Sequence, residues 1–80
     1  MRITHELFAD IPGLGERIKN AREASGKTTT ALARAAGMSR GNWYRIESEE
    51  LKSIPLDTLK RIEEALEIDL GSNQIFEAKQ

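Results

Sequence analysis

The side chains best suited to bind a partner cluster in one short segment, residues 40–47. Trp43 and Ile46 lie three residues apart there, which is the spacing of one buried helix face. Burial of that face turns four residues outward: Arg40, Gly41, Tyr44 and Arg45. A guanidinium group offers several N–H donors in a fixed fork, and a phenol both donates and accepts hydrogen bonds. The segment therefore predicts a helix that presents hydrogen-bond donors to a partner.

The chain offers little for catalysis or for metal binding. It contains no cysteine, and His5 is its single histidine. Structural zinc sites are built from Cys and His ligands, and a Ser-His-Asp set could form only through His5. Gly13 and Gly15 lie at the entry to a predicted helix, but without a preceding strand or a third glycine they make no nucleotide-binding loop. We expect no enzyme activity, no metal, no cofactor and no small-molecule substrate.

Four helices are predicted from the spacing of apolar residues and from residues that favour helix ends. They span residues 14–25, 29–36, 40–47 and 56–66. Thr28 and Ser39 suit the N-caps of the second and third helices, and Gly26 and Gly37 suit the ends of the first and second. Pro55 suits the opening of the fourth. Strand-type alternation is absent, so we expect a compact all-α fold of four to five helices.

The length of 80 residues predicts one small domain. Residues 1–12 form a leader with room for one short helical turn, and residues 13–70 form the folded domain. Residues 71–80 form a tail, which is either part of a fifth helix or an extended arm. No apolar run is long enough to cross a membrane, and the first residues lack the apolar core of a signal peptide. We expect a cytoplasmic protein with no membrane partner.

The small net charge hides a division between the two halves of the chain. Residues 1–46 carry eight Lys and Arg and four acidic residues, a net charge of +4. Residues 47–80 carry four Lys and Arg and nine acidic residues, a net charge of −5, so the whole chain has −1. A chance division of the charges is one interpretation. The other is a basic working face with an acidic remainder, which is compatible with a nucleic-acid partner.

Residues 29–47 resemble the helix-turn-helix of the phage repressor and Cro family (XRE-like). Ala33 lies where the two short helices cross, and Gly37 permits the positive φ of the turn. The landmarks that match are Arg22…Gly26, Leu32-Ala33, Gly37-Met38-Ser39-Arg40, Arg45-Ile46-Glu47 and Leu59 to Leu66. The resemblance covers residues 14–68. It implies a repressor-like domain that places the helix at 40–47 in the major groove of double-stranded DNA.

The same resemblance implies roles for individual residues. Those that would touch base edges are Arg40, Gly41, Tyr44 and Arg45. Those that would lie against phosphates are Thr28, Thr29, Ser39 and Asn42. Arg22 and Glu47 match an ion pair that ties the first helix to the end of the reading helix. An arginine at position 40 or 45 can donate two hydrogen bonds to guanine, a contact worth ~1–3 kcal/mol of discrimination.

Several positions depart from the family pattern. Thr29 replaces a glutamine that both binds a phosphate and braces the reading helix, and threonine is too short to do both. Gly41 supplies no side chain to a base and costs about 1 kcal/mol of helix stability relative to Ala. Glu49 and Glu50 would repel DNA unless they turn away. Glu67 stands where a glycine often ends the fourth helix.

These features predict a sequence-specific transcriptional regulator that binds DNA as a homodimer. One monomer offers only about three to five cationic contacts, too few for tight binding. Two half-sites would lie about one helical turn apart. The candidate dimer residues are Ile68, Leu70, Ile75 and Phe76 in the tail and Ile3, Leu7 and Phe8 in the leader. Alternatively, these side chains complete the core of the monomer.

Two other functions remain open from the sequence. An antitoxin or a restriction–modification controller would use the same DNA-binding domain. A protein-interaction module on a helix-turn-helix scaffold would instead use the acidic second half of the chain. The acidic residues that motivate this second alternative are Glu47, Glu49, Glu50, Glu63, Glu64, Glu67 and Asp69.

Overall fold

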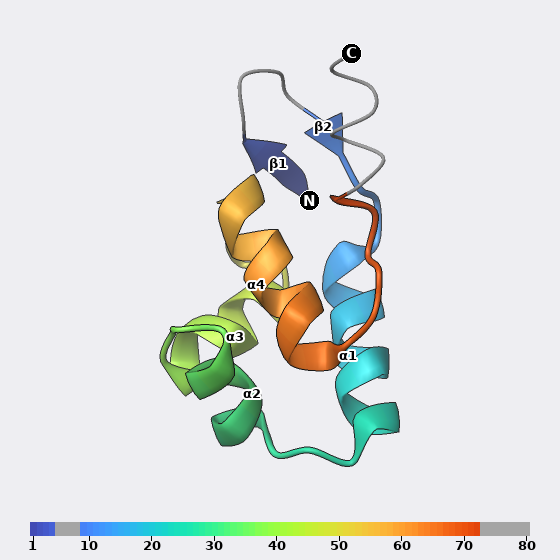
Figure 1. The fold of residues 1–80 in the computed structure, drawn as a ribbon. Helices are drawn as coiled ribbons and strands as arrows, with labels where there is room; N and C mark the ends of the chain where they lie inside the picture. The colour runs from blue at the N-terminus through green and yellow to red at the C-terminus, as the bar shows by residue number, and fades with distance from the viewer. Residues whose placement is uncertain (5–8, 73–80) are drawn as a thin grey trace.

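The computed structural model describes residues 1–4 and 9–72, which form four helices and three short strands (Figure 1). In chain order the elements are β1 (Arg2–Thr4), β2 (Ala9–Asp10), α1 (Leu14–Ser25), α2 (Thr29–Ala35), α3 (Arg40–Glu47), β3 (Ser53–Pro55) and α4 (Leu56–Leu66). Figure 1 shows β1 and β2 at one end of the molecule, with α2 and α3 toward the other. In this view the helix-turn-helix pair lies away from β1 and β2.

The predicted helices are confirmed, and α2 ends one residue earlier than expected. Side-chain caps explain two of the starts. The Thr28 hydroxyl accepts a hydrogen bond from the Ala31 N–H at 3.1 Å, and the Ser39 hydroxyl accepts one from the Asn42 N–H at 3.1 Å. Each cap supplies an acceptor to an N–H group that has no partner inside its helix.

The turn between α2 and α3 depends on Gly37, whose φ is +73°. The Gly37 N–H donates to the Arg34 carbonyl at 3.0 Å, and the Met38 N–H donates to the Ala33 carbonyl at 2.9 Å. These two bonds define a Schellman motif, which satisfies carbonyl groups at the end of α2. Glycine adopts the left-handed conformation without a steric penalty, so the chain turns directly into α3.

The expectation of an all-α fold is wrong, because a small sheet forms in the order β2-β1-β3. β1 is antiparallel to β2 and parallel to β3, with Ile3 opposite Ile54. The leader therefore contributes strands at 2–4 and 9–10, where the sequence left room for one short helical turn. Strands of two or three residues are too short to show alternation. The pairing of β1 with β3 also joins segments about fifty residues apart, which local patterns do not reveal.

One hydrophobic core joins the strands to the helices. Its buried members are Met1, Ile3, Leu14, Ile18, Leu32, Ala33, Ala36, Trp43, Ile46, Ile54, Leu56, Leu59, Ile62, Ala65, Leu66 and Leu70. Two candidate dimer residues, Ile3 and Leu70, are thus part of the monomer core, whereas Ile68 is 40% exposed. The other candidates, Leu7, Phe8, Ile75 and Phe76, lie outside the described residues.

The described part of the chain has neither a membrane-spanning helix nor a cluster of metal-binding side chains. None of its helices combines the length and the apolar character that crossing a membrane requires. Residues 1–4 and 9–72 contain no group of three or more His, Cys, Asp or Glu placed to hold a metal ion. His5 and the tail beyond Ser72 lie outside this range.

Candidate nucleic-acid interface

One face of the short helix α3 packs against the rest of the domain. Trp43 and Ile46 are fully buried there, as the three-residue spacing predicts. The indole N–H of Trp43 also donates to the Glu47 carboxylate at 2.6 Å. The Glu47 carboxylate, on the last turn of α3, therefore provides a hydrogen-bond acceptor for the indole N–H of Trp43, the largest buried side chain of the helix.

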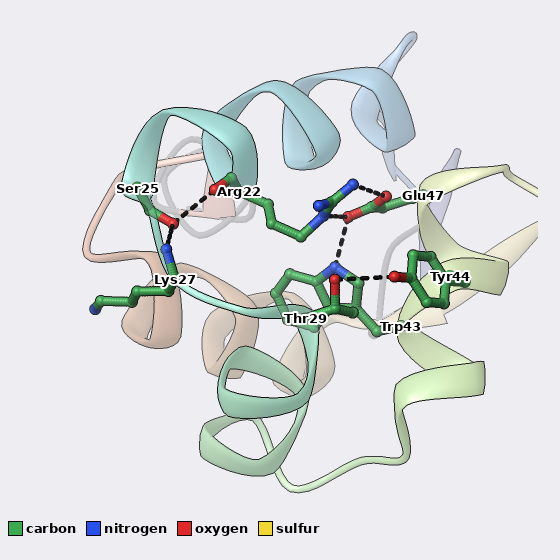
Figure 2. A network of polar contacts seen from close by, with 7 residues as sticks. All are labelled: Arg22, Ser25, Lys27, Thr29, Trp43, Tyr44 and Glu47. Atoms are coloured by element: carbon green, nitrogen blue, oxygen red, sulfur yellow. Dashed lines mark hydrogen bonds and ion pairs between the residues drawn. The ribbon is translucent and has the colours of Figure 1, made fainter.

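Glu47 also joins α3 to α1 (Figure 2). Its carboxylate accepts from Arg22 Nε at 2.6 Å and from Arg22 Nη2 at 3.1 Å. The Glu47 side chain is 6% exposed and that of Arg22 is 19% exposed. The hydrogen bond with Glu47 raises the pKa of Arg22 above its ordinary value, so the guanidinium stays charged. This two-pronged, poorly solvated ion pair restricts movement of α3 relative to α1.

Gly15 allows α1 and α3 to approach each other closely. A Cβ atom at this position would lie 2.3 Å from the Glu47 carbonyl oxygen and 2.9 Å from that of Ile46. Any larger residue would push the start of α1 away from the end of α3. The sequence alone does not predict this role of Gly15, because nothing local shows which backbone comes near it.

Tyr44 is held by α2 and lies beside α1. Its hydroxyl donates to Thr29 Oγ1 at 3.2 Å, and the Arg22 guanidinium carbon lies 5.9 Å from the centre of its ring. Thr29 is 7% exposed, so its hydroxyl serves this contact and not the open surface. Threonine is indeed short, but the longer Tyr44 spans the gap and braces the helix (Figure 2).

The opposite face of α3 is open. Arg40, Gly41 and Arg45 are exposed, and Tyr44 is 47% exposed despite its brace. No ion pair involving Arg40 or Arg45 forms within residues 1–4 and 9–72. The four residues predicted to face a partner therefore share one surface, and neither guanidinium group on it pairs with another of the described residues.

A groove of about 610 Å³ lies between this face and α1. It is lined by Lys19, Arg22, Gly41, Tyr44, Arg45, Glu47, Ser48 and Glu50. Lys19 was absent from the sequence prediction. It precedes Arg22 by three residues on the same helix, and this spacing could have indicated that it shares the face of Arg22. The groove adds a third cation to the basic surface.

The residues assigned to phosphates are partly available. The capping hydroxyls of Thr28 and Ser39 are exposed. Each accepts a backbone hydrogen bond, which leaves its own proton free to donate. Asn42 is half-buried, and its amide lies 3.8 Å from the Met38 sulfur. Thr28 and Ser39 thus suit a phosphate contact best, at the starts of α2 and α3.

The two glutamates after α3 take different directions. Glu49 has a φ of +57°, and its carboxylate accepts from the Gly15 N–H at 3.3 Å and lies 3.2 Å from the Met1 amino group. It has turned toward α1 and β1. Glu50 is exposed and lines the groove beside Arg45. The expected repulsion of DNA therefore concerns Glu50 and not Glu49.

The geometry defines a helix-turn-helix protein, with α2 and α3 joined by a glycine turn and one face of α3 free. Comparison with family models agrees, since the model described as helix-turn-helix domain matches residues 13–70. The chain belongs to this helix-turn-helix family, which indicates DNA binding. No curated protein and no solved structure gives a significant match.

Proposed function

We propose that this protein is a sequence-specific transcriptional regulator that reads the major groove of double-stranded DNA with α3. The observation that carries the proposal is the free face of α3. Arg40, Tyr44 and Arg45 are exposed on a helix whose other face is held by Trp43 and Glu47. A rigid helix with free guanidinium groups suits bidentate contacts to guanine.

The starts of α2 and α3 support this orientation. Thr28 and Ser39 present exposed hydroxyl groups there, where backbone N–H groups and the helix dipoles also favour an anion. Phosphate contacts of this kind set the position of a protein on DNA, and base contacts then provide the specificity. We assign the phosphate contacts chiefly to Thr28 and Ser39, with smaller parts for the backbone N–H of Thr29 and for Asn42.

We further propose that the regulator is cytoplasmic and acts as a homodimer. The DNA-facing surface of one monomer has few cations, among them Lys19, Arg40 and Arg45. Two copies on a two-fold site double this number and lengthen the sequence that is read. Of the dimer candidates in the described residues, only Ile68 is an exposed large hydrophobic side chain.

Selection from random DNA duplexes tests the proposal. The protein is expected to enrich one motif, with related half-sites about one helical turn apart. Fluorescence anisotropy should then show tighter binding to that duplex than to a shuffled duplex of the same composition. Equal affinity for both duplexes at every salt concentration would contradict sequence-specific binding, and no binding to either at low salt would contradict DNA binding.

A further inference from the structure

The turn that ends α3 separates two neighbouring carboxylates. The Glu49 N–H donates to the Ile46 carbonyl at 3.1 Å, and the Glu50 N–H donates to the Arg45 carbonyl at 3.0 Å. These bonds form a second Schellman motif, with Glu49 in the left-handed position that glycine usually occupies. The motif holds the backbone N–H of Glu50 against the Arg45 carbonyl, about one turn further along the chain.

Glu49 is engaged inside the protein. Its two carboxylate oxygens face the Gly15 N–H and the Met1 amino group, and its side chain is 34% exposed. This negative charge is therefore partly neutralised and lies toward the strand end of α1. It is not available to a partner that approaches the free face of α3.

Glu50 has a different environment. It is exposed and lines the groove that also contains Lys19, Tyr44 and Arg45. In the described ranges, 1–4 and 9–72, no side chain or backbone group pairs with its carboxylate. Its backbone N–H, in contrast, donates to the Arg45 carbonyl and to the Ser48 hydroxyl at 3.4 Å. An unneutralised negative charge thus lies among the cations of the groove.

We propose that Glu50 is a negative determinant of affinity for DNA, which opposes entry of a backbone phosphate into the groove between α1 and α3. This inference rests on the proposed function. A phosphate that enters the groove meets the positive groups of Lys19 and Arg45, and it also meets the carboxylate of Glu50. Like charges repel, and a repulsive element can limit binding to unwanted sites. Affinity for DNA therefore depends on repulsion of the phosphate by Glu50 as well as on its attraction to Lys19 and Arg45.

The test compares three variants, in each of which a neutral amide replaces one carboxylate and the net charge changes by one unit. Glu50→Gln removes the carboxylate from the groove, Glu49→Gln removes its neighbour, and Glu64→Gln removes an exposed carboxylate on α4. Affinity for the selected duplex and for a shuffled duplex is measured by anisotropy over a series of salt concentrations. Thermal unfolding confirms that each variant is folded.

Glu50→Gln is expected to bind both duplexes about threefold more tightly than the unchanged protein at low salt. Glu50→Lys, which adds a cation in the same place, should steepen the salt dependence of log affinity by about 0.9. Glu49→Gln and Glu64→Gln should bind as the unchanged protein does.

Two results would overturn it. If Glu50→Gln and the unchanged protein bind with equal affinity at every salt concentration, Glu50 has no such role, although the proposed function stands. If Glu49→Gln or Glu64→Gln gains as much as Glu50→Gln, the effect belongs to net charge and not to the groove. Failure of every protein to bind any duplex would overturn both the inference and the proposed function.

Discussion

Glu47 is the single side chain on which the position of α3 depends most. It accepts three hydrogen bonds, two from Arg22 and one from Trp43. Conversion to a neutral amide removes the counter-charge of a largely buried arginine and leaves at least one N–H group without a good acceptor. Such a loss costs more than the pair itself contributes.

Glu47→Gln is therefore expected to lower the free energy of unfolding by about 2–3 kcal/mol. Urea denaturation followed by Trp43 fluorescence measures the change, and Glu64→Gln on α4 is the matched control. A loss of less than about 0.5 kcal/mol would show that the ion pair does not stabilise the domain. The contribution of Arg22 to this change in the free energy of unfolding should not vary with pH near neutrality. A raised arginine pKa adds stability that is lost only above its already high value.

The residues of the site differ in how far sequence could predict them. The Arg22–Glu47 pair was expected from the family resemblance and forms as a bidentate contact. The bond from Trp43 to Glu47 follows helical i, i+4 spacing, so it was accessible in principle. The close approach at Gly15 was not, because it depends on how two helices far apart in the chain pack together.

At the scale of elements, local signals explain why the helices were predictable. Capping hydroxyls at Thr28 and Ser39 and the glycine turn at Gly37 act within a few residues. The strands have no such signal, since β1 joins β3 through pairing such as Ile3 with Ile54. Nonlocal contacts of this kind decided the fold class where local periodicity indicated helices alone.

The C-terminal end of α4 offers a test of local backbone strain. Glu67 has a φ of +57°, a conformation that costs roughly 1–2 kcal/mol for residues with a side chain. Its contact with Lys27, at 3.1 Å, joins two exposed groups and adds little. Glu67→Gly should therefore raise the free energy of unfolding by about 0.5–1 kcal/mol. A lower free energy of unfolding for Glu67→Gly, measured by chemical denaturation, would contradict this explanation.

Gly41 provides a second test within α3, because the fold itself does not require glycine there. A Cβ atom at this helical position would have no neighbour within 4 Å. Gly41→Ala should raise the free energy of unfolding by about 1 kcal/mol. If α3 lies close against DNA, the same change should weaken DNA binding several-fold.

Gly15→Ala is the control for Gly41→Ala. Its added methyl group would collide with the Glu47 carbonyl, so this variant should be less stable than the unchanged protein. Calorimetry and anisotropy together decide the outcome. A more stable Gly41→Ala protein with unchanged affinity for DNA would show that no partner approaches this position closely.

The whole molecule separates a small sheet at one end from the helix-turn-helix near the other (Figure 1). The net charge of −1 also conceals the local basic groups near α3, because Lys19 and Arg45 line one groove and Arg40 is exposed on the same helix as Arg45. Charge averaged over the chain thus says little about the surface that a partner meets. The sequence predicted that Glu49 and Glu50 would repel DNA unless they turned away. The carboxylate of Glu49 has turned toward α1 and Met1, so the predicted repulsion is left to Glu50.

Homodimer formation is the prediction that belongs to this scale. Sedimentation should give twice the chain mass of 9.0 kDa, and the fraction of dimer should rise with protein concentration. Ile68→Asp should lower that fraction without unfolding the domain, because Ile68 is exposed and its neighbour Leu70 is buried. A mass of one chain at all concentrations, with and without the selected duplex, would contradict a dimer.

The most direct test of the central claim is the base preference of α3 variants. Arg40→Ala and Arg45→Ala are compared with Arg61→Ala, whose side chain pairs with Asp57 on α4 at 2.7 Å. Loss of an arginine that reads guanine should weaken binding to the selected duplex by about 5- to 150-fold and relax the preference at one base pair. Arg61→Ala should bind nearly as the unchanged protein does. Equal affinity and identical selected motifs for all four proteins would contradict the proposal that α3 reads DNA.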